Sequence, residues 1–122
     1  MHIHGAAAVI DGEIKKQVCI KAVDGFITAV STNCTDTPDS NHAGTLIPGF
    51  VDIHSHGGGG FYFSDLSPEN VAAARNTHLA CGTTTHIASL VTEPIGVLEE
   101  QILRLLPLVN AGVFEGIHLE GP

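Results

Sequence analysis

An alternation of strand-like and helix-like segments after residue 45 limits the fold more than any other feature. The apolar runs with strand composition are 46–56, 83–92 and 113–121, and the segments with helical character are 68–81 and 94–109. Strands that alternate with helices build a parallel sheet through βαβ crossovers. Parallel sheets are usually covered or closed into a barrel, so we expect an α/β fold with the first three βα units of a truncated TIM-type (β/α)8 barrel. A complete three-strand α/β domain is the alternative.

Capping and periodicity support the two helices. Ser67 is suited to an N-cap and Pro68 to the first helical position, and Gly82 is suited to the position after the first helix. In the second helix an apolar stripe recurs at helical spacing, and a Glu–Arg pair lies four residues apart on the outside. The stripe consists of Leu98, Ile102, Leu105 and Val109, and the pair is Glu100 and Arg104. Pro107 is expected to kink or shorten this helix.

The first 45 residues have a different pattern, with strand-like segments and turn signals but no helical segment. Three strand-like segments are separated by Asp11-Gly12 and Asp24-Gly25, which are strong signals for two-residue hairpin turns. The polar stretch 32–44 predicts a surface connection and the domain boundary. We therefore expect part of a β-sandwich-like domain over residues 1–45 and the start of the barrel over residues 46–122.

Charge and composition exclude several classes of function. The chain has 122 residues, with 13 acidic and 5 basic side chains and a net charge of −8, which disfavours binding to nucleic acid and to anionic membranes. No apolar run approaches the roughly 20 residues that span a bilayer, so we expect a cytoplasmic protein. The spacings of Cys19, Cys34 and Cys81 indicate neither a disulfide framework nor a metal knuckle, and three reduced thiols are expected.

The sequence PGFVDIHSHGGGG, residues 48–60, carries the strongest chemical signal. Period-two alternation predicts that Phe50, Asp52, His54 and His56 share one face of a strand. Two histidines on one face can bind a single metal ion at the carboxyl end of the strand, where barrel enzymes place their active sites. The glycines that follow allow the backbone to turn away and leave space above the site.

The last strand-like segment ends in IHLEGP and supplies a carboxylate. Glu120 is predicted at the carboxyl end of its strand, level with His56, where it could bind one ion or bridge two. His118 on the same face is expected one layer deeper, as a supporting or core residue.

The remaining histidines carry weaker signals. His86 is expected to face either a helix or the barrel interior, and His42 and His78 are expected at the surface. His2 and His4 repeat the spacing of His54 and His56 but lack a glycine-rich exit, so a structural role is expected for them. No dinucleotide fingerprint, Walker A loop or serine-hydrolase elbow is present in the sequence.

Three motifs that follow the N-terminal β segment resemble the amidohydrolase superfamily and, within it, the N-acetylglucosamine-6-phosphate deacetylases. They are LIPGFVDIHSHGGGG, HLACGTTTHIASLVT and GIHLEGP. The H-x-H pair is shared with dihydroorotases, hydantoinases, adenine deaminases and isoaspartyl dipeptidases, whereas HGGGG together with HLEGP is more specific. The similarity covers about the first third of such an enzyme.

The resemblance implies that His54, His56 and Glu120 are metal ligands for one or two divalent ions, zinc or iron. It further implies hydrolysis of N-acetylglucosamine 6-phosphate to glucosamine 6-phosphate and acetate by the full-length enzyme, which is expected to be a homodimer. The acid/base aspartate, the other ligands and the sugar-phosphate contacts are expected beyond Pro122. No catalytic residue is assigned within this chain. The chain alone is expected to be inactive and either to self-associate or to pack its apolar strands and helices in an altered arrangement.

Two other interpretations stay open. The chain could belong to another amidohydrolase, such as an isoaspartyl dipeptidase or a cyclic-amide hydrolase. It could also be a non-enzymatic metal-binding module that dimerises through an open sheet edge.

Overall fold

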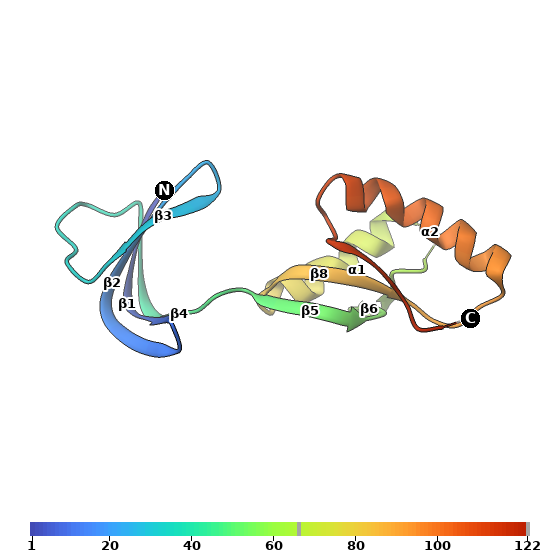
Figure 1. The fold of residues 1–122 in the computed structure, drawn as a ribbon, viewed down its shortest axis with the longest axis horizontal. Helices are drawn as coiled ribbons and strands as arrows, with labels where there is room; N and C mark the ends of the chain where they lie inside the picture. The colour runs from blue at the N-terminus through green and yellow to red at the C-terminus, as the bar shows by residue number, and fades with distance from the viewer. Residues whose placement is uncertain (66, 122) are drawn as a thin grey trace. The chain divides into compact units, whose positions relative to one another are not determined.

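The computed structural model describes residues 1–65 and 67–121, so Pro122 of the HLEGP motif lies outside the described residues. The chain divides into two compact units, Met1–Pro48 and Gly49–Pro122, called unit 1 and unit 2 below. Each unit has its own sheet (Figure 1).

Unit 1 is a four-stranded sheet in the order β3-β2-β1-β4. The strands are β1 (His2–Ile10), β2 (Glu13–Val23), β3 (Phe26–Ser31) and β4 (Ser40–Leu46). The β1–β2 and β2–β3 pairs are antiparallel, and β4 runs parallel to β1. Both predicted hairpin turns are confirmed, because Asp11 and Asp24 have φ of 51° and the glycine that follows each is also at positive φ.

The prediction of an irregular connection over residues 32–44 is wrong in its second half, which forms most of β4. Ser40, Asn41 and His42 have weak strand propensity, so their sequence gave little signal. Main-chain pairing to β1 forms the strand instead. Gly5 permits this pairing, since a Cβ there would lie 2.7 Å from a methyl carbon of Leu46.

Unit 2 contains a parallel sheet in the order β5-β8-β9, with a helix in each crossover. The elements are β5 (Phe50–Ser55), α1 (Pro68–Ala80), β8 (Thr83–Leu90), α2 (Ile95–Asn110) and β9 (Gly116–Leu119). The predicted alternation of strands and helices is confirmed. The first strand is shorter than expected, however, because Leu46 ends β4 and β5 begins only after Pro48, which has no N–H to donate to a ladder.

The helix signals are largely confirmed. The Ser67 side chain accepts a hydrogen bond from the Asn70 N–H, and Gly82 follows the end of α1 with a φ of 96°. Glu100 and Arg104 form the expected ion pair. The expected shortening at Pro107 is wrong, since α2 continues to Asn110. Contacts of the apolar stripe with the core compensate for the one missing helical hydrogen bond.

The core of unit 2 is larger than that of unit 1. It joins residues of both helices, β8 and the flanking loops: Phe63, Val71, Ala74, Ala88, Leu90, Leu98, Leu105 and Phe114. Among the described residues of unit 1, the buried apolar side chains are Ala8, Val18 and Cys19. The stability of unit 1 therefore depends more than that of unit 2 on strand pairing and on any disulfide bond.

Unit 1 does contain such a link, a disulfide between Cys19 and Cys34. The expectation of three reduced thiols is wrong for this pair. The fold brings β2 close to the loop after β3, with the two Cα atoms 5.6 Å apart, a separation that suits a disulfide. Cys81 is exposed and belongs to no disulfide within residues 1–65 and 67–121.

The glycine run after His56 forms a small antiparallel hairpin that the sequence did not predict. Its strands are β6 (Gly57–Gly58) and β7 (Phe61–Tyr62). A Cβ at residue 57 would lie 2.1 Å from the Phe61 carbonyl oxygen, so only glycine allows this approach. In the part of the chain that the structure describes, no helix has both the length and the apolar character needed to cross a membrane.

Candidate metal centre

His54, His56 and Glu120 converge at the carboxyl ends of the parallel strands. His56 Nε2 lies 3.1 Å from Glu120 Oε2, and His54 Nε2 lies 3.7 Å from Glu120 Oε1. Each side chain offers one ligand atom, and the three atoms lie within 4.8 Å of one another. His54 lies near the end of β5, His56 directly follows that strand, and Glu120 directly follows β9.

The sheet explains why residues more than 60 positions apart in sequence meet here. Strand β8 lies between β5 and β9, and the Glu120 N–H donates to the Leu90 carbonyl at the end of β8. His54, His56 and Glu120 therefore reach across the end of the central strand from both sides. The three side chains are between about one quarter and one half exposed, so the site opens to solvent.

The surroundings of the two histidines suit a metal ion. His56 Nδ1 is buried and has no hydrogen-bond partner among the described residues, while its Nε2 faces the carboxylate. The His118 ring lies 4.7 Å from the His54 ring, and its Nδ1 is 3.1 Å from the Ser89 hydroxyl, which orients it. Two imidazole nitrogens with one carboxylate oxygen form a donor set suited to zinc or iron.

Asp52 is not part of this group. The prediction that it shares a face with His54 and His56 is wrong, because the register is irregular between Asp52 and Ser55. Its carboxylate lies 3.7 Å from His78 Nδ1 and 3.9 Å from His86 Nε2. These three side chains form a second group that could hold a metal ion.

This second group comes from β5, α1 and β8, which sequence spacing could not connect. The prediction of a surface position is wrong for His78, which is three-quarters buried and hydrogen-bonded through Nε2 to the Gly57 carbonyl oxygen. It is confirmed for His42, which is exposed. His86 packs against Phe63 and Phe114 of the core, and burial lowers the pKa of its imidazole.

A third group of potential ligands was missed in the sequence, where His2 and His4 were assigned a structural role. These two histidines and Cys19 place one ligand atom each within 4.8 Å of one another in unit 1. Cysteine spacing gave no signal, because Cys19 reaches the histidines only through strand pairing.

Comparisons with known proteins point to one enzyme family. No protein-family model matches the chain. The N-acetylglucosamine-6-phosphate deacetylase of Bacillus subtilis is 30% identical over 98% of this chain and 33% of the relative. The N-acetylgalactosamine-6-phosphate deacetylase of Shewanella sp. (strain ANA-3) is 28% identical over 97% of this chain and 32% of the relative. The chain thus spans about one third of the length of these curated relatives.

Solved structures of deacetylases are also similar to this chain. The N-acetyl-D-glucosamine-6-phosphate deacetylase of Mycobacterium smegmatis matches all of this chain and 35% of its own with a TM-score of 0.90 at 37% identity. An Asp→Ala variant of that enzyme, in complex with N-acetyl-D-glucosamine 6-phosphate, matches equally well over 32% of its chain. The Thermotoga maritima enzyme matches all of this chain and 32% of its own, with a TM-score of 0.78 at 25% identity.

Proposed function

Because the chain corresponds to the N-terminal third of the N-acetylglucosamine-6-phosphate deacetylases, which are amidohydrolases, we propose that it supplies part of a metal-dependent deacetylase active site. The reaction is hydrolysis of the acetamide of an N-acetylhexosamine 6-phosphate to the free amine and acetate. The observation that carries this proposal is the convergence of His54, His56 and Glu120 at the carboxyl ends of parallel strands.

In this proposal His54 and His56 would hold a divalent ion, zinc or iron, through Nε2, and Glu120 would be a further ligand for one or two such ions. Such an ion supplies Lewis acidity, which polarises an amide carbonyl and lowers the pKa of water. His118 holds the His54 ring in place through its own hydrogen bond to Ser89. The β6–β7 hairpin turns the chain away from the strand ends and leaves the ligand side chains accessible.

We further propose that the β5-β8-β9 sheet belongs to a (β/α)8 barrel. Residues outside this chain would complete the ligand set, contribute an aspartate as general acid and base, and bind the sugar phosphate. The 122 residues alone should therefore not deacetylate the substrate, and the complete enzyme is proposed to be a cytoplasmic homodimer.

A second candidate substrate is N-acetylgalactosamine 6-phosphate. The Shewanella relative is named for it, and its similarity covers nearly the whole of this chain. The two sugar phosphates differ in the orientation of one ring hydroxyl and carry the same acetamide. The proposed metal ligands would serve either substrate, so residues outside this chain would decide between them.

A chimera tests the activity. The N-terminal third of the Mycobacterium smegmatis deacetylase is replaced by this chain, and acetate release is measured with both sugar phosphates. We expect turnover that the His54→Ala, His56→Ala double variant abolishes and that the exposed control His42→Ala retains. A folded chimera with full activity in the double variant would contradict the proposal.

Metal binding can be tested in the chain itself. Plasma mass spectrometry should find zinc or iron bound to the oxidised protein and lost in the His54→Ala, His56→Ala variant. Equal metal content in the two proteins would show that this pair is not a ligand set.

Self-association is a separate expectation for the isolated chain. Strand β5 lies at the edge of its sheet, and Val51 and Ile53 are each 64% exposed on it. Sedimentation velocity should detect dimers or larger species that Val51→Thr, Ile53→Thr reduces. A monomer at all concentrations would contradict this expectation.

A further inference from the structure

His2 and His4 of β1 and Cys19 of β2 form a group of potential ligands in unit 1 that the proposed hydrolytic site does not use. The inference drawn from them does not rest on the proposed function. It depends on three observations: strand register, unpartnered imidazole nitrogens and the position of a second cysteine.

Strand register places the three side chains together. His2 and His4 are two residues apart on β1 and so point to the same face. Cys19 is the direct partner of His4 in the antiparallel β1–β2 pair, and side chains at such positions lie about 5 Å apart at Cβ. The arrangement therefore follows from regular strand geometry.

Both imidazoles are left with an unsatisfied nitrogen. The Nε2 atoms of His2 and His4 are buried and have no hydrogen-bond partner within residues 1–65 and 67–121. The two rings lie 4.8 Å apart, nearly perpendicular to each other. Leaving a buried polar atom unpaired is costly, so two adjacent unpaired nitrogens point to a shared ligand.

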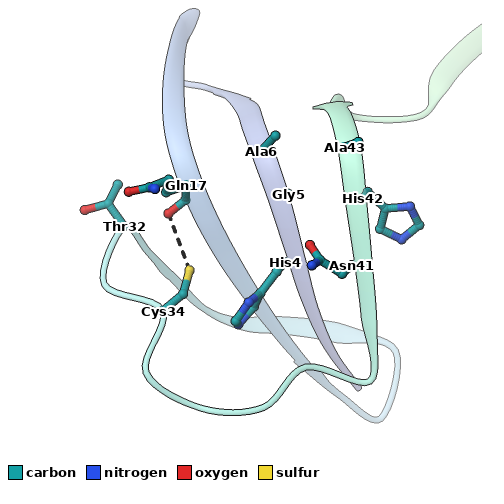
Figure 2. Close-up of a pocket in the computed structure, with 9 residues that line it drawn as sticks. All are labelled: His4, Gly5, Ala6, Gln17, Thr32, Cys34, Asn41, His42 and Ala43. Carbon is teal, nitrogen blue, oxygen red and sulfur yellow. Dashed lines mark hydrogen bonds between the residues drawn. The ribbon is translucent and has the colours of Figure 1, made fainter.

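Cys34 supplies a possible fourth ligand. It is bonded to Cys19 and lies in the loop between β3 and β4. Its sulfur is 3.4 Å from the Gln17 carbonyl oxygen, the dashed line in Figure 2.

Two cavities give access to the group. A cavity of about 480 Å³ is lined by His4 and Cys34 among others (Figure 2). A second, of about 190 Å³, is lined by His2, Cys19 and Cys34. The first cavity therefore reaches His4 and Cys34, and the second reaches His2 and both cysteines.

We propose that unit 1 contains a redox-controlled zinc site. When Cys19 and Cys34 are reduced, their thiolates and the Nε2 atoms of His2 and His4 bind one Zn²⁺. Two nitrogens and two sulfurs are a common tetrahedral donor set for structural zinc. When the cysteines form the disulfide, the sulfurs are no longer available as thiolates and the site cannot bind zinc.

A dithiol can reduce the disulfide form and so allow the chain to bind zinc. The dithiol gives two electrons and two protons to the Cys19–Cys34 bond and is itself oxidised to a disulfide. Zinc binding to the two resulting thiols then releases two protons. In a reducing compartment, where disulfides are rare, the zinc form would predominate.

The test uses the full chain with His54→Ala, His56→Ala and Cys81→Ser, which removes the other histidine pair and the exposed thiol. The protein is reduced with a dithiol, desalted without oxygen, incubated with Zn²⁺ or Co²⁺ and desalted again. We expect the reduced chain to bind about one zinc more than the oxidised chain, since the Asp52, His78 and His86 group is the same in both. Bound cobalt should show sulfur-to-metal charge-transfer absorption.

Adding His2→Gln, His4→Gln should weaken zinc binding by at least about tenfold, whereas the exposed control His42→Gln should bind as before. Zinc should also slow alkylation of Cys19 and Cys34 in the chain with intact His2 and His4, a measurement that does not depend on how the variants fold. The proposal is overturned if zinc leaves this alkylation unchanged. It is also overturned if reduced and oxidised chains take up equal zinc, or if a folded His2→Gln, His4→Gln variant retains the site.

Discussion

His2 and His4 in unit 1 and His54 and His56 in unit 2 have the same spacing but different neighbours. The first pair begins an antiparallel pairing, both its Nε2 atoms are buried, and one nitrogen of each ring lies within 4.8 Å of the Cys19 sulfur. The second pair lies at the end of a parallel strand, between about one quarter and one half exposed, beside the Glu120 carboxylate. Spacing therefore predicts that two imidazoles share a face, while residues on other strands determine which ligand the pair can bind.

The two units also differ in how they are stabilised, and the largest expected effect tests that difference. Phe114→Ala removes a fully buried ring from the unit 2 core and should lower the free energy of unfolding by about 3–5 kcal/mol. Val18→Ala, at a fully buried site of unit 1, should cost only about 1.6 kcal/mol, for two methyl groups. Urea unfolding measures both. If Val18→Ala lowered the free energy of unfolding as much as Phe114→Ala, unit 1 would depend on its core at least as strongly as unit 2.

Reduction of the Cys19–Cys34 disulfide should have the next largest effect. The bond closes a loop with a sequence separation of 15, and constraining the unfolded chain in this way stabilises by about 3 kcal/mol. In metal-free buffer, unit 1 should therefore unfold at lower urea after reduction, as hydrogen exchange of β1 and β2 would report. Cys81→Ser is the matched control and should change stability by less than about 0.5 kcal/mol. Unchanged protection after reduction would show that strand pairing alone maintains unit 1.

A ligand substitution would sharpen the contrast between the two histidine pairs. Glu120→Gln keeps the size of the side chain but removes its charge, and it should weaken metal binding at His54 and His56 by about 100-fold, or about 2.7 kcal/mol. Zinc uptake by the reduced unit 1 site should not change. Competition with a fluorescent chelator measures both affinities. Loss of both sites would indicate that the two groups are not independent.

The smallest expected effect concerns pH. Burial lowers the pKa of His86 below its ordinary value of 6.5. Between the lowered folded value and 6.5 the unfolded chain binds a proton that the folded chain does not. Stability should therefore fall as pH decreases through that window. Urea midpoints from about pH 8 to about pH 5 should show this loss, and His86→Gln should reduce it relative to His42→Gln. If the urea midpoint of His86→Gln fell with decreasing pH as steeply as that of His42→Gln, other groups would be responsible for the loss of stability.

Local signals predicted much of the fold. Asp11-Gly12 and Asp24-Gly25 formed the expected hairpins, and Ser67 and Gly82 mark the ends of α1. These predictions succeeded because each depends on backbone preferences or hydrogen bonds within a few residues. Strand β4 was missed because its pairing partner, β1, lies more than 30 residues earlier in the chain.

The sequence by itself determined the local elements, the face shared by His54 and His56, and the resemblance to the deacetylases. Only the tertiary structure decided which side chains meet. It brought Glu120 to His54 and His56, turned Asp52 toward His78 and His86, and joined Cys19 to Cys34. The physical reason is that strand order, register and bulges set contacts between distant segments, and spacing along one strand contains no information about them.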